Sequence, residues 1–250
     1  MKILVCVKRI LDTAVKVKIS SDGKKIDKSD AEYVLSPYDE IAVEHAIRIK
    51  EKIPNTEVII LTLGINDAEK NIRTTLAMGA DRAILLEGNP DTFESFAIAK
   101  ALAEAIKIEK PDMVLTGVKS SDNENSQVGP MIASLLEMPF ISTATSLEIN
   151  DNKVKAESEM EGYQLLLEAS FPCVISIQKS NVDPRICSLI NIRKAKTKEL
   201  KKSSVSLTPA QWQIIKVALA AERKGGKIVG QGIDAVPKLF ELLRQEAKVL

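Results

Sequence analysis

The 250-residue sequence lacks several features that would place it in a specialised class. Its three cysteines, Cys6, Cys173 and Cys187, include no C-x-x-C pair, which argues against a disulfide scaffold and favours a reducing, intracellular setting. No apolar run approaches the roughly 18 residues that a membrane span needs, and the apolar stretch at the amino terminus is too short for a signal peptide. We therefore expect a cytoplasmic protein that makes no direct membrane insertion, and the sequence predicts no metal site.

The chain also has few aromatic residues and almost no net charge. Aromatic residues make up 4% of the sequence, and the formal net charge is +1, which argues against a whole-protein field for nucleic acid. One run, residues 179–202, is locally basic, with eight Lys or Arg against Asp183 and Glu199. Few aromatics interleave this run, so base stacking has little to work with, and we predict no nucleic-acid partner. A solvated helix face is the simplest interpretation of such a run.

What is present is the pattern of a soluble α/β protein. Hydrophobic residues make up 45% and charged residues 28% of the chain, enough for one large core. Short apolar runs typical of buried strands occur at residues 2–7, 57–63, 81–86 and 112–116. Helical patterns separate them at residues 37–52, 66–78 and 92–108. This alternation predicts a mostly parallel, Rossmann-like sheet with helices on both faces.

Beyond Pro139 the helices disappear from the pattern. Strand-like runs at residues 140–149, 153–160, 163–171 and 173–178 predict an antiparallel extension of the sheet, with a hairpin turn at Asp151-Asn152. Near the amino terminus, the Asp22-Gly23 turn predicts another hairpin. We expect an α/β domain over residues 1–200 and a helical arm over residues 201–250.

The arm is predicted from three stretches. Residues 203–207 are linker-like, residues 209–224 have a helical pattern that contains Trp212, and residues 234–249 form an amphipathic helical pattern. We expect a tail of this kind, after the main domain, to contact a partner protein.

Two helix starts carry capping patterns. In Ser36-Pro37-Tyr38-Asp39, the serine can cap the helix and Pro37 fits its first turn. The Asp39 carboxylate is placed to make the reciprocal hydrogen bond of a capping box. Asn66 and Glu69 have the same spacing. His45 is the only histidine, and without a second histidine its predicted role is packing or surface exposure.

The loop at residues 117–129 is the candidate ligand site. It follows the strand at 112–116 and precedes a helical pattern that starts near Pro130, so helix amides would point at it, as in many phosphate sites. The chain contains neither G-x-x-x-x-G-K-[ST] nor G-x-G-x-x-G, so any nucleotide is bound by another geometry. Loops of this type are also polar simply because they are solvated. The candidate residues here are Gly117, Lys119, Ser120, Ser121, Asp122, Asn123, Asn125, Ser126, Gln127, Val128 and Gly129.

Several stretches resemble one family. LVCVKRILDTAVKVKI, SPYDEIAVEHAIRIKE, IRTTLAMGADRAILL, TGVKSSDNENSQVGP and VDPRICSLINIRKAK occur in the order and spacing of the beta subunit of electron transfer flavoprotein. The resemblance covers residues 1 to about 200 and weakens beyond Leu207. It implies a non-catalytic electron carrier that pairs with an alpha subunit, whose own domain holds most of the FAD.

The resemblance also implies a nucleotide in this chain. Family members hold AMP with a structural role at the carboxyl edge of the sheet, and the matching positions are Cys6, Ser36, Pro37, Tyr38, Asp39, Leu63 and the loop from Gly117 to Val128. In electron-bifurcating relatives the same pocket holds a second FAD that accepts hydride from NADH. Val128-Gly129-Pro130 is similar to that group, whereas VKRILDTAVKVKI is similar to the AMP-binding group, so both alternatives stay open.

The basic run acquires a role from the same resemblance. It is similar to the segment with which the family docks on a flavin dehydrogenase such as an acyl-CoA dehydrogenase, with Leu189 as the apolar anchor. The matching residues are Pro184, Arg185, Leu189, Arg193, Lys194 and Lys196. Tyr38 matches a family position that faces the flavin of the alpha subunit, whereas Thr13 occupies a position where an aromatic residue is common in the family. A stand-alone ATP-binding stress-type module is the competing class on this sheet, but VKRILDT lacks the Ser-Gly-Gly-type loop of ATP-cleaving enzymes.

Overall fold

The computed structural model describes residues 1–12, 14–29, 32–92, 94–205, 207, 210, 214–221 and 225–250. Its main sheet has nine strands, in the order β11-β10-β9-β12-β8-β1-β6-β7-β13. These strands are β1 (Lys2–Cys6), β6 (Glu57–Gly64), β7 (Arg82–Glu87), β8 (Met113–Gly117), β9 (Phe140–Asn150), β10 (Lys153–Met160), β11 (Tyr163–Ser170), β12 (Cys173–Ile177) and β13 (Leu200–Ser204). The helices are α1 (Pro37–Lys52), α2 (Glu69–Met78), α3 (Ser95–Glu109), α4 (Val128–Leu136), α5 (Leu189–Ala195) and α6 (Val236–Gln245).

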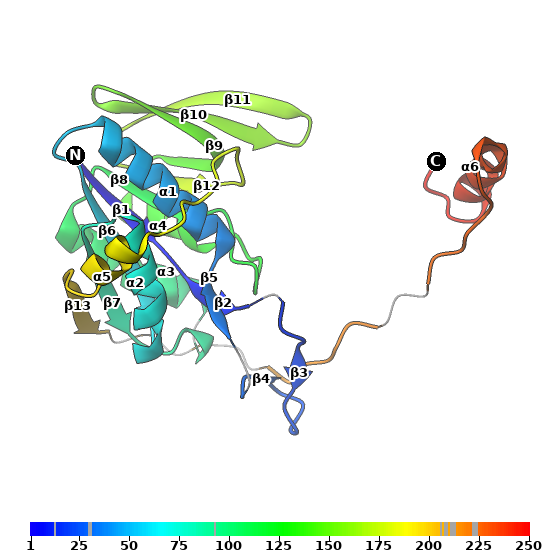
Figure 1. The fold of residues 1–250 in the computed structure, drawn as a ribbon, viewed down its shortest axis with the longest axis horizontal. Helices are drawn as coiled ribbons and strands as arrows, with labels where there is room; N and C mark the ends of the chain where they lie inside the picture. The colour runs from blue at the N-terminus through cyan, green and yellow to red at the C-terminus, as the bar shows by residue number, and fades with distance from the viewer. Residues whose placement is uncertain are drawn as a thin grey trace.

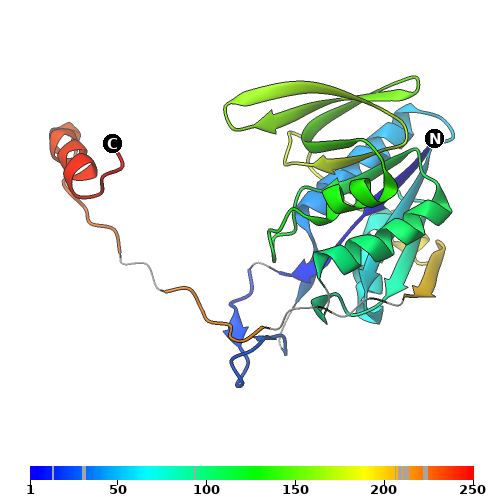
Figure 2. The ribbon, with the colours of Figure 1, turned by 180° about the vertical axis from the view of Figure 1, so that it is seen from behind.

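The sheet interior is parallel and buried on both faces, as the apolar runs predicted. β1 pairs in parallel with β6 on one side and with β8 on the other. Alternate residues of β1 enter two separate cores: Ile3 and Val5 pack with α1 and α2, and Leu4 and Cys6 pack with α3 and α4. Figure 1 shows α1, α2 and α5 in front of the sheet, and Figure 2 shows α3 and α4 on the opposite face. The predicted arrangement of helices on both faces is confirmed.

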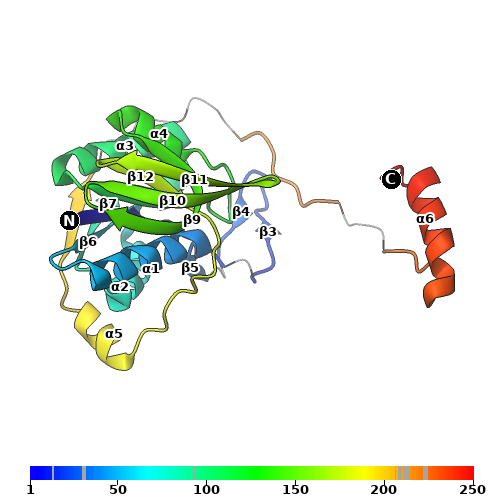
Figure 3. The same ribbon diagram turned by 90° about the horizontal axis from the view of Figure 1, so that it is seen from above.

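The carboxyl half of the sheet differs in one respect from the expected antiparallel extension. β10 is antiparallel to both β9 and β11, as predicted, and its hairpin to β9 turns at Asp151-Asn152. β12, however, runs parallel to both β8 and β9. Figure 3 shows β9, β10, β11 and β12 together on one side of the molecule, beside α4. The β9–β10 and β10–β11 hairpins each reverse the direction of the chain once, so the chain regains the direction of β9 and β12 enters between β8 and β9 in the parallel sense.

Both capping patterns were wrong in detail. Ser36 is the residue before α1, but its buried hydroxyl has no hydrogen-bond partner among the described residues. The Asp39 carboxylate accepts from the amides of Lys8 and Gly117, and the Ser36 amide donates to the Lys8 carbonyl instead. Asn66–Ala68 forms a short 3-10 turn, and α2 begins only at Glu69, without a side-chain cap. The prediction of a linker at residues 203–207 also failed in part, because β13 extends to Ser204 and pairs in parallel with β7.

Small accessory strands lie around the sheet. β2 (Arg9–Leu11) pairs with β5 (Tyr33–Leu35), and β3 (Lys18–Ile19) pairs with β4 (Ile26–Asp27) in the predicted hairpin. Residues 214–221 form no helix, which contradicts that part of the predicted helix at 209–224; Trp212 lies outside the described residues, as does Thr13. A short 3-10 turn (Ile233–Ala235) leads into α6, and Figures 1 to 3 show α6 apart from the sheet. No helix in the described ranges has the length and apolar character needed to cross a bilayer.

Candidate nucleotide site and docking segment

A pocket opens over the carboxyl ends of the central strands. The chain order reverses between β1 and β8, because β6 and β7 follow on one side of β1 and β12 follows on the far side of β8. In open α/β sheets this switch point is where a crevice forms and ligands bind. The pocket lies there, at the ends of β1, β6 and β8 and under the loop before α4. The sheet topology therefore selects the same loop as the sequence pattern.

Most of the expected site residues line this pocket. They are Cys6, Asp39, Leu63, Gly117, Lys119, Ser120, Asn123, Asn125, Ser126, Gln127, Val128 and Gly129. The other expected residues, Ser36, Pro37, Tyr38, Ser121 and Asp122, do not line it. Tyr38, Ser121 and Asp122 each adjoin a lining residue along the chain, and the Ser36 amide donates a hydrogen bond to the carbonyl of Lys8, which lines the pocket. Val118, within the predicted loop, also lines it, and so do residues outside the predicted set: Val7, Lys8, Pro90, Ser95, Ile98, Leu102 and Thr116.

Asp39 joins the two strand ends on either side of the switch point. Its carboxylate accepts hydrogen bonds from the amide of Lys8, at 2.7 Å, and from the amide of Gly117, at 3.0 Å. Burial raises the pKa of Asp39 to about 7, against the opposing effect of these amides and of the Lys8 ammonium. Asp39 therefore links the segments that follow β1 and β8. Because its carboxylate is used in these two hydrogen bonds, it does not make the reciprocal hydrogen bond of a capping box with Ser36.

Lys8 bonds to side chains of the polar loop at residues 117–129. Its Nζ lies 2.7 Å from both carboxylate oxygens of Asp122 and 3.1 Å from the hydroxyl of Ser120. Burial acts to raise the pKa of Asp122, but the hydrogen bonds from Lys8 and Ser120 outweigh it and leave that pKa below its usual range. The second cation that lines the pocket, Lys119, forms an ion pair with Glu124 at 2.9 Å. Both lysines thus have partners within the loop that they border.

Two glycines let the loop approach the strands. A Cβ on Gly117 would lie 2.4 Å from Oδ1 of Asp39, and one on Gly129 would lie 2.9 Å from the hydroxyl oxygen of Thr116. A side chain at either place would therefore collide with its neighbour. The Thr116 hydroxyl is itself buried and has no hydrogen-bond partner among the described residues. The close packing of backbone at Gly129 brings the first turn of α4 to the edge of the pocket.

The pocket has an apolar side and a polar side. Leu63, Ile98 and Leu102 supply the apolar wall. The loop residues 122–127 are exposed and supply side-chain amides and hydroxyls beside the amino end of α4, where unpaired backbone N–H groups favour an anion. A ligand with a flat apolar part and an anionic part matches this division.

The thiol that lines the pocket is not a reactive nucleophile. Burial raises the pKa of the Cys6 thiol far above its usual range, with a further contribution from Asp39, so the thiol stays protonated at neutral pH. His45, buried on α1, lies outside the pocket, and burial lowers its pKa to about 4. Among the described residues, no group of three or more His, Cys, Asp or Glu is arranged to hold a metal ion.

The basic run folds into an exposed segment on the α1 and α2 side of the sheet. It includes α5, capped by the Ser188 hydroxyl, which accepts a hydrogen bond from the Asn191 amide. Leu189 is 78% exposed, and Ile186 and Ile190 are exposed as well. Arg193, Lys194 and Lys196 are exposed near them, whereas the guanidinium of Arg185 is turned inward onto α1. We call residues 180–198 the docking segment, after the role that the family resemblance predicts for them.

The arm carries apolar residues that the described chain leaves exposed. α6 buries none of its residues, and Val236, Leu239 and Phe240 are all more than 40% exposed. One backbone hydrogen bond, from the Val217 amide to the Gly23 carbonyl at 2.8 Å, links the arm to the β3–β4 hairpin. A helix with such an uncovered apolar stripe is typical of an interface.

The fold and the pocket together define an α/β protein of the class that binds ligands in the crevice at a topological switch point. Comparison with known proteins then gives the family. The model of the electron transfer flavoprotein domain matches residues 24–208. The electron transfer flavoprotein subunit beta of Syntrophomonas wolfei is 38% identical over 250 residues, which is all of this chain and 98% of that protein. The subunits of the same name from Bacillus subtilis and Homo sapiens are 35% and 34% identical, over 100% and 98% of both chains compared.

The chain belongs to the electron transfer flavoprotein family and is a beta subunit of it. Members of this kind are electron transfer proteins and not enzymes in the usual sense, and a beta subunit implies a partner subunit.

Proposed function

We propose that this chain is the AMP-holding half of a heterodimeric electron transfer flavoprotein, which carries electrons from flavin dehydrogenases to a downstream acceptor. The alpha subunit would hold most of the FAD, and bound FAD supplies the electron-carrying chemistry. This chain would contribute a rigid support for the partner, a structural nucleotide and the surface that meets the dehydrogenase.

The observation that carries the proposal is the pocket at the switch point between β1 and β8. Its apolar wall suits an adenine ring, and its polar loop and the amino end of α4 suit ribose and phosphate. Lys8 and Asp39 keep the two strand ends and the loop in place. The described residues therefore fit a nucleotide held for structure.

The alternative occupant is a second FAD, as in bifurcating relatives, which would accept hydride from NADH. The run Val128-Gly129-Pro130 favours it, and all three residues lie at the start of α4, where Val128 and Gly129 line the pocket. The pocket as described serves both occupants, because each has an adenosine and phosphate part.

The experiment is to coexpress the chain with its alpha subunit and to count flavin and AMP per heterodimer. The AMP proposal expects one FAD and one AMP, and it expects the chain purified alone to be nearly colourless. Two FAD per heterodimer without AMP, or a yellow isolated chain with stoichiometric flavin, would favour the bifurcating alternative. A heterodimer with neither extra FAD nor AMP would contradict both.

Docking on the dehydrogenase is the second part of the proposal. An exposed leucine flanked by cations fits an anchor-and-rim arrangement, in which the apolar anchor supplies affinity and the charges speed the encounter. Leu189 is the anchor, and Arg193, Lys194 and Lys196 are the cations. An acyl-CoA dehydrogenase is the proposed kind of partner.

A further inference from the structure

A buried carboxylate on α1 lies under the docking segment. The Glu44 side chain is only 2% exposed, and burial alone would raise its pKa. Hydrogen bonds from Arg185 and Arg48 outweigh that effect, so the pKa of Glu44 lies below its usual range and the group is an anion. Arg48 comes from the same helix and lies 2.8 Å away, whereas Arg185 comes from the docking segment.

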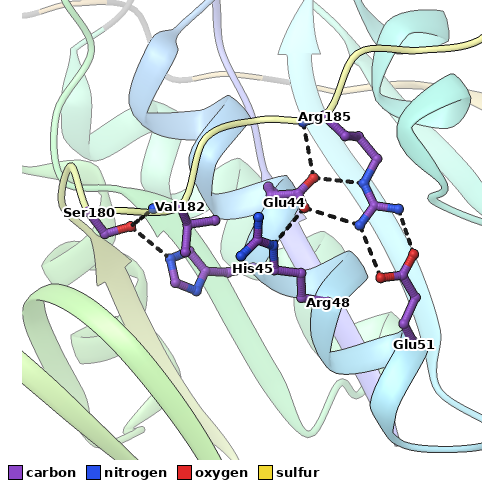
Figure 4. A network of polar contacts seen from close by, with 7 residues as sticks. All are labelled: Glu44, His45, Arg48, Glu51, Ser180, Val182 and Arg185. Atoms are coloured by element: carbon purple, nitrogen blue, oxygen red, sulfur yellow. Dashed lines mark hydrogen bonds and ion pairs between the residues drawn. The ribbon is translucent and has the colours of Figure 1, made fainter.

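Arg185 forms two forked pairs at once (Figure 4). Its Nε and Nη2 donate to the two oxygens of Glu44 at 2.8 and 3.1 Å. Its Nη1 and Nη2 donate to the two oxygens of Glu51 at 2.6 and 3.1 Å. The planar guanidinium of arginine makes such pairs and a lysine cannot. Four of the five N–H donors of the Arg185 guanidinium are therefore used on α1.

The same helix also holds the start of the segment. Nε2 of His45 lies 3.4 Å from the Ser180 hydroxyl, which accepts a hydrogen bond from the Val182 amide (Figure 4). Ser180, Val182 and Arg185 thus follow the surface of α1, and the chain between them is held at both ends.

The far end of the segment is held by α2. Nη1 of Arg73 donates to the carbonyl oxygens of Ala195 and Lys198, at 2.9 and 2.7 Å. In the opposite direction, from the docking segment to α2, the Lys198 ammonium donates a hydrogen bond to the Leu76 carbonyl at 2.9 Å. Ala195, the last residue of α5, is buried. The carboxyl end of α5 is therefore fixed to α2.

Between these two attachments the docking segment presents exposed apolar residues. Ile186 is 97%, Leu189 78% and Ile190 65% exposed. A seven-residue helix such as α5 is too short to hold its shape by itself. Contacts outside the helix have to keep Leu189 in place, and Arg185 and Arg73 supply guanidinium contacts on either side of it.

We propose that Arg185 and Arg73 are positioning residues for docking: they brace the segment on α1 and α2 so that Leu189 is presented to the dehydrogenase in a preformed geometry. This inference rests on the proposed docking function. It assigns to Arg185 a role apart from the steering cations, because its charge is neutralised within the chain. Preorganisation of this kind increases affinity by removing the entropy cost of ordering the segment at the moment of binding.

The test uses the purified heterodimer and an acyl-CoA dehydrogenase that reduces the wild-type protein. Arg185→Lys keeps the charge and loses both forks, and Arg48→Lys is the matched control because Arg48 pairs with the same Glu44 without touching the docking segment. We expect Arg185→Lys to raise the KM for the heterodimer about tenfold, since several side chains must then be ordered on binding. The kcat at saturation and the salt dependence should stay as in the wild type, and Arg48→Lys should change KM less than twofold.

Hydrogen exchange supplies a readout independent of the partner. Amides of residues 186–195 should exchange faster in Arg185→Lys and in Arg73→Lys than in Arg48→Lys, at an unchanged melting temperature.

If Arg185→Lys unfolds the protein, Glu51→Gln, which removes only the exposed outer pair, must still raise KM. An unchanged KM in these variants would contradict the proposed bracing role of the arginines. Leu189→Ala distinguishes this bracing role from the docking function on which it rests. If Leu189→Ala raises KM and the Arg185 and Arg73 variants do not, the docking function is supported and the bracing role is contradicted. If Leu189→Ala leaves KM unchanged, the docking proposal itself is contradicted.

Discussion

The Nζ of Lys8 lies 2.7 Å from both carboxylate oxygens of Asp122, and this pair ties the end of the first strand to the loop that covers the pocket. The two residues are 114 positions apart in the chain. Each side chain is about 30% exposed, so the pair is partly shielded from water and less screened than a pair at the open surface. It fixes the loop at the point where the candidate nucleotide site begins.

Removing this pair should loosen the loop without unfolding the domain. We expect Lys8→Met to release AMP at least several-fold more readily from the isolated chain, because the loop loses its anchor, while the melting temperature falls only slightly. Calorimetric AMP titration and hydrogen exchange over residues 117–129 measure the two effects. Exchanging the charges in Lys8→Asp with Asp122→Lys should restore part of the loop protection. If Lys8→Met binds AMP as tightly as the wild type, the pair has no role at the site.

The buried Asp39 carboxyl should make stability depend on pH. Burial raises its pKa to about 7 from an ordinary value of 3.8. Because the folded protein then holds this proton more tightly than the unfolded chain, the stabilisation is complete below about pH 4 and is lost as the pH rises through 7. Melting temperatures of the wild type and of Asp39→Asn should be compared from pH 5 to 8. The wild type should lose its advantage as pH rises, and a difference that is constant over this range would contradict the raised pKa.

Gly129 should tolerate no branched side chain. A Cβ there would meet the Thr116 hydroxyl at 2.9 Å and Phe140 at 3.6 Å, so Gly129→Val must displace the start of α4 from the pocket. We expect AMP binding by the isolated chain to fall by about tenfold or more, and assembly with the alpha subunit to fall with it. Gly226→Val is the matched control for AMP binding, since a Cβ on Gly226 meets no atom within 4 Å. Unchanged nucleotide content and heterodimer yield in Gly129→Val would refute the site.

Leu189 should matter for electron transfer and not for folding. Because its side chain is 78% exposed, Leu189→Ala should change the free energy of unfolding by less than about 0.5 kcal/mol. An anchor that fills a partner pocket contributes about 2 kcal/mol or more, so affinity for the dehydrogenase should fall at least roughly tenfold. Neutralising Arg193 and Lys194 should instead slow association and flatten its dependence on salt. Thermal melts and stopped-flow reduction of the same variants distinguish a docking anchor from a core residue or a bystander.

The sequence predicted the centre of the fold well because that part is encoded locally. β1, β6, β7 and β8 are continuous apolar runs buried on both faces, and each is separated from the next by a helix with its own apolar stripe. It also selected the loop at residues 117–129, since a polar loop between a buried strand and a helix is visible in the letters alone. Parallel pairing then follows from the short crossovers.

The failures share a physical cause, which is competition from distant partners. The Asp39 carboxylate could cap its own helix, but two amides of neighbouring strands bind it instead, and no local pattern reveals that choice. β13 has only five residues with a polar, lysine-containing sequence, and it is a strand because the edge of β7 is open to receive it. Lys8, Ile98 and Leu102 escaped notice for the same reason, because they belong to the pocket only after the sheet has brought three elements together.

The sequence by itself determined the class of the protein, the family to which it belongs, the candidate loop and the basic run, because hydrophobic period and motif spacing are properties of adjacent residues. Only the tertiary structure decided what each charge does. Arg185 and Arg193 are eight positions apart in one basic run, yet the first is turned onto Glu44 and Glu51 and the second is exposed. The difference comes from the packing of the docking segment on α1, which places one guanidinium against a buried carboxylate and leaves the other in water.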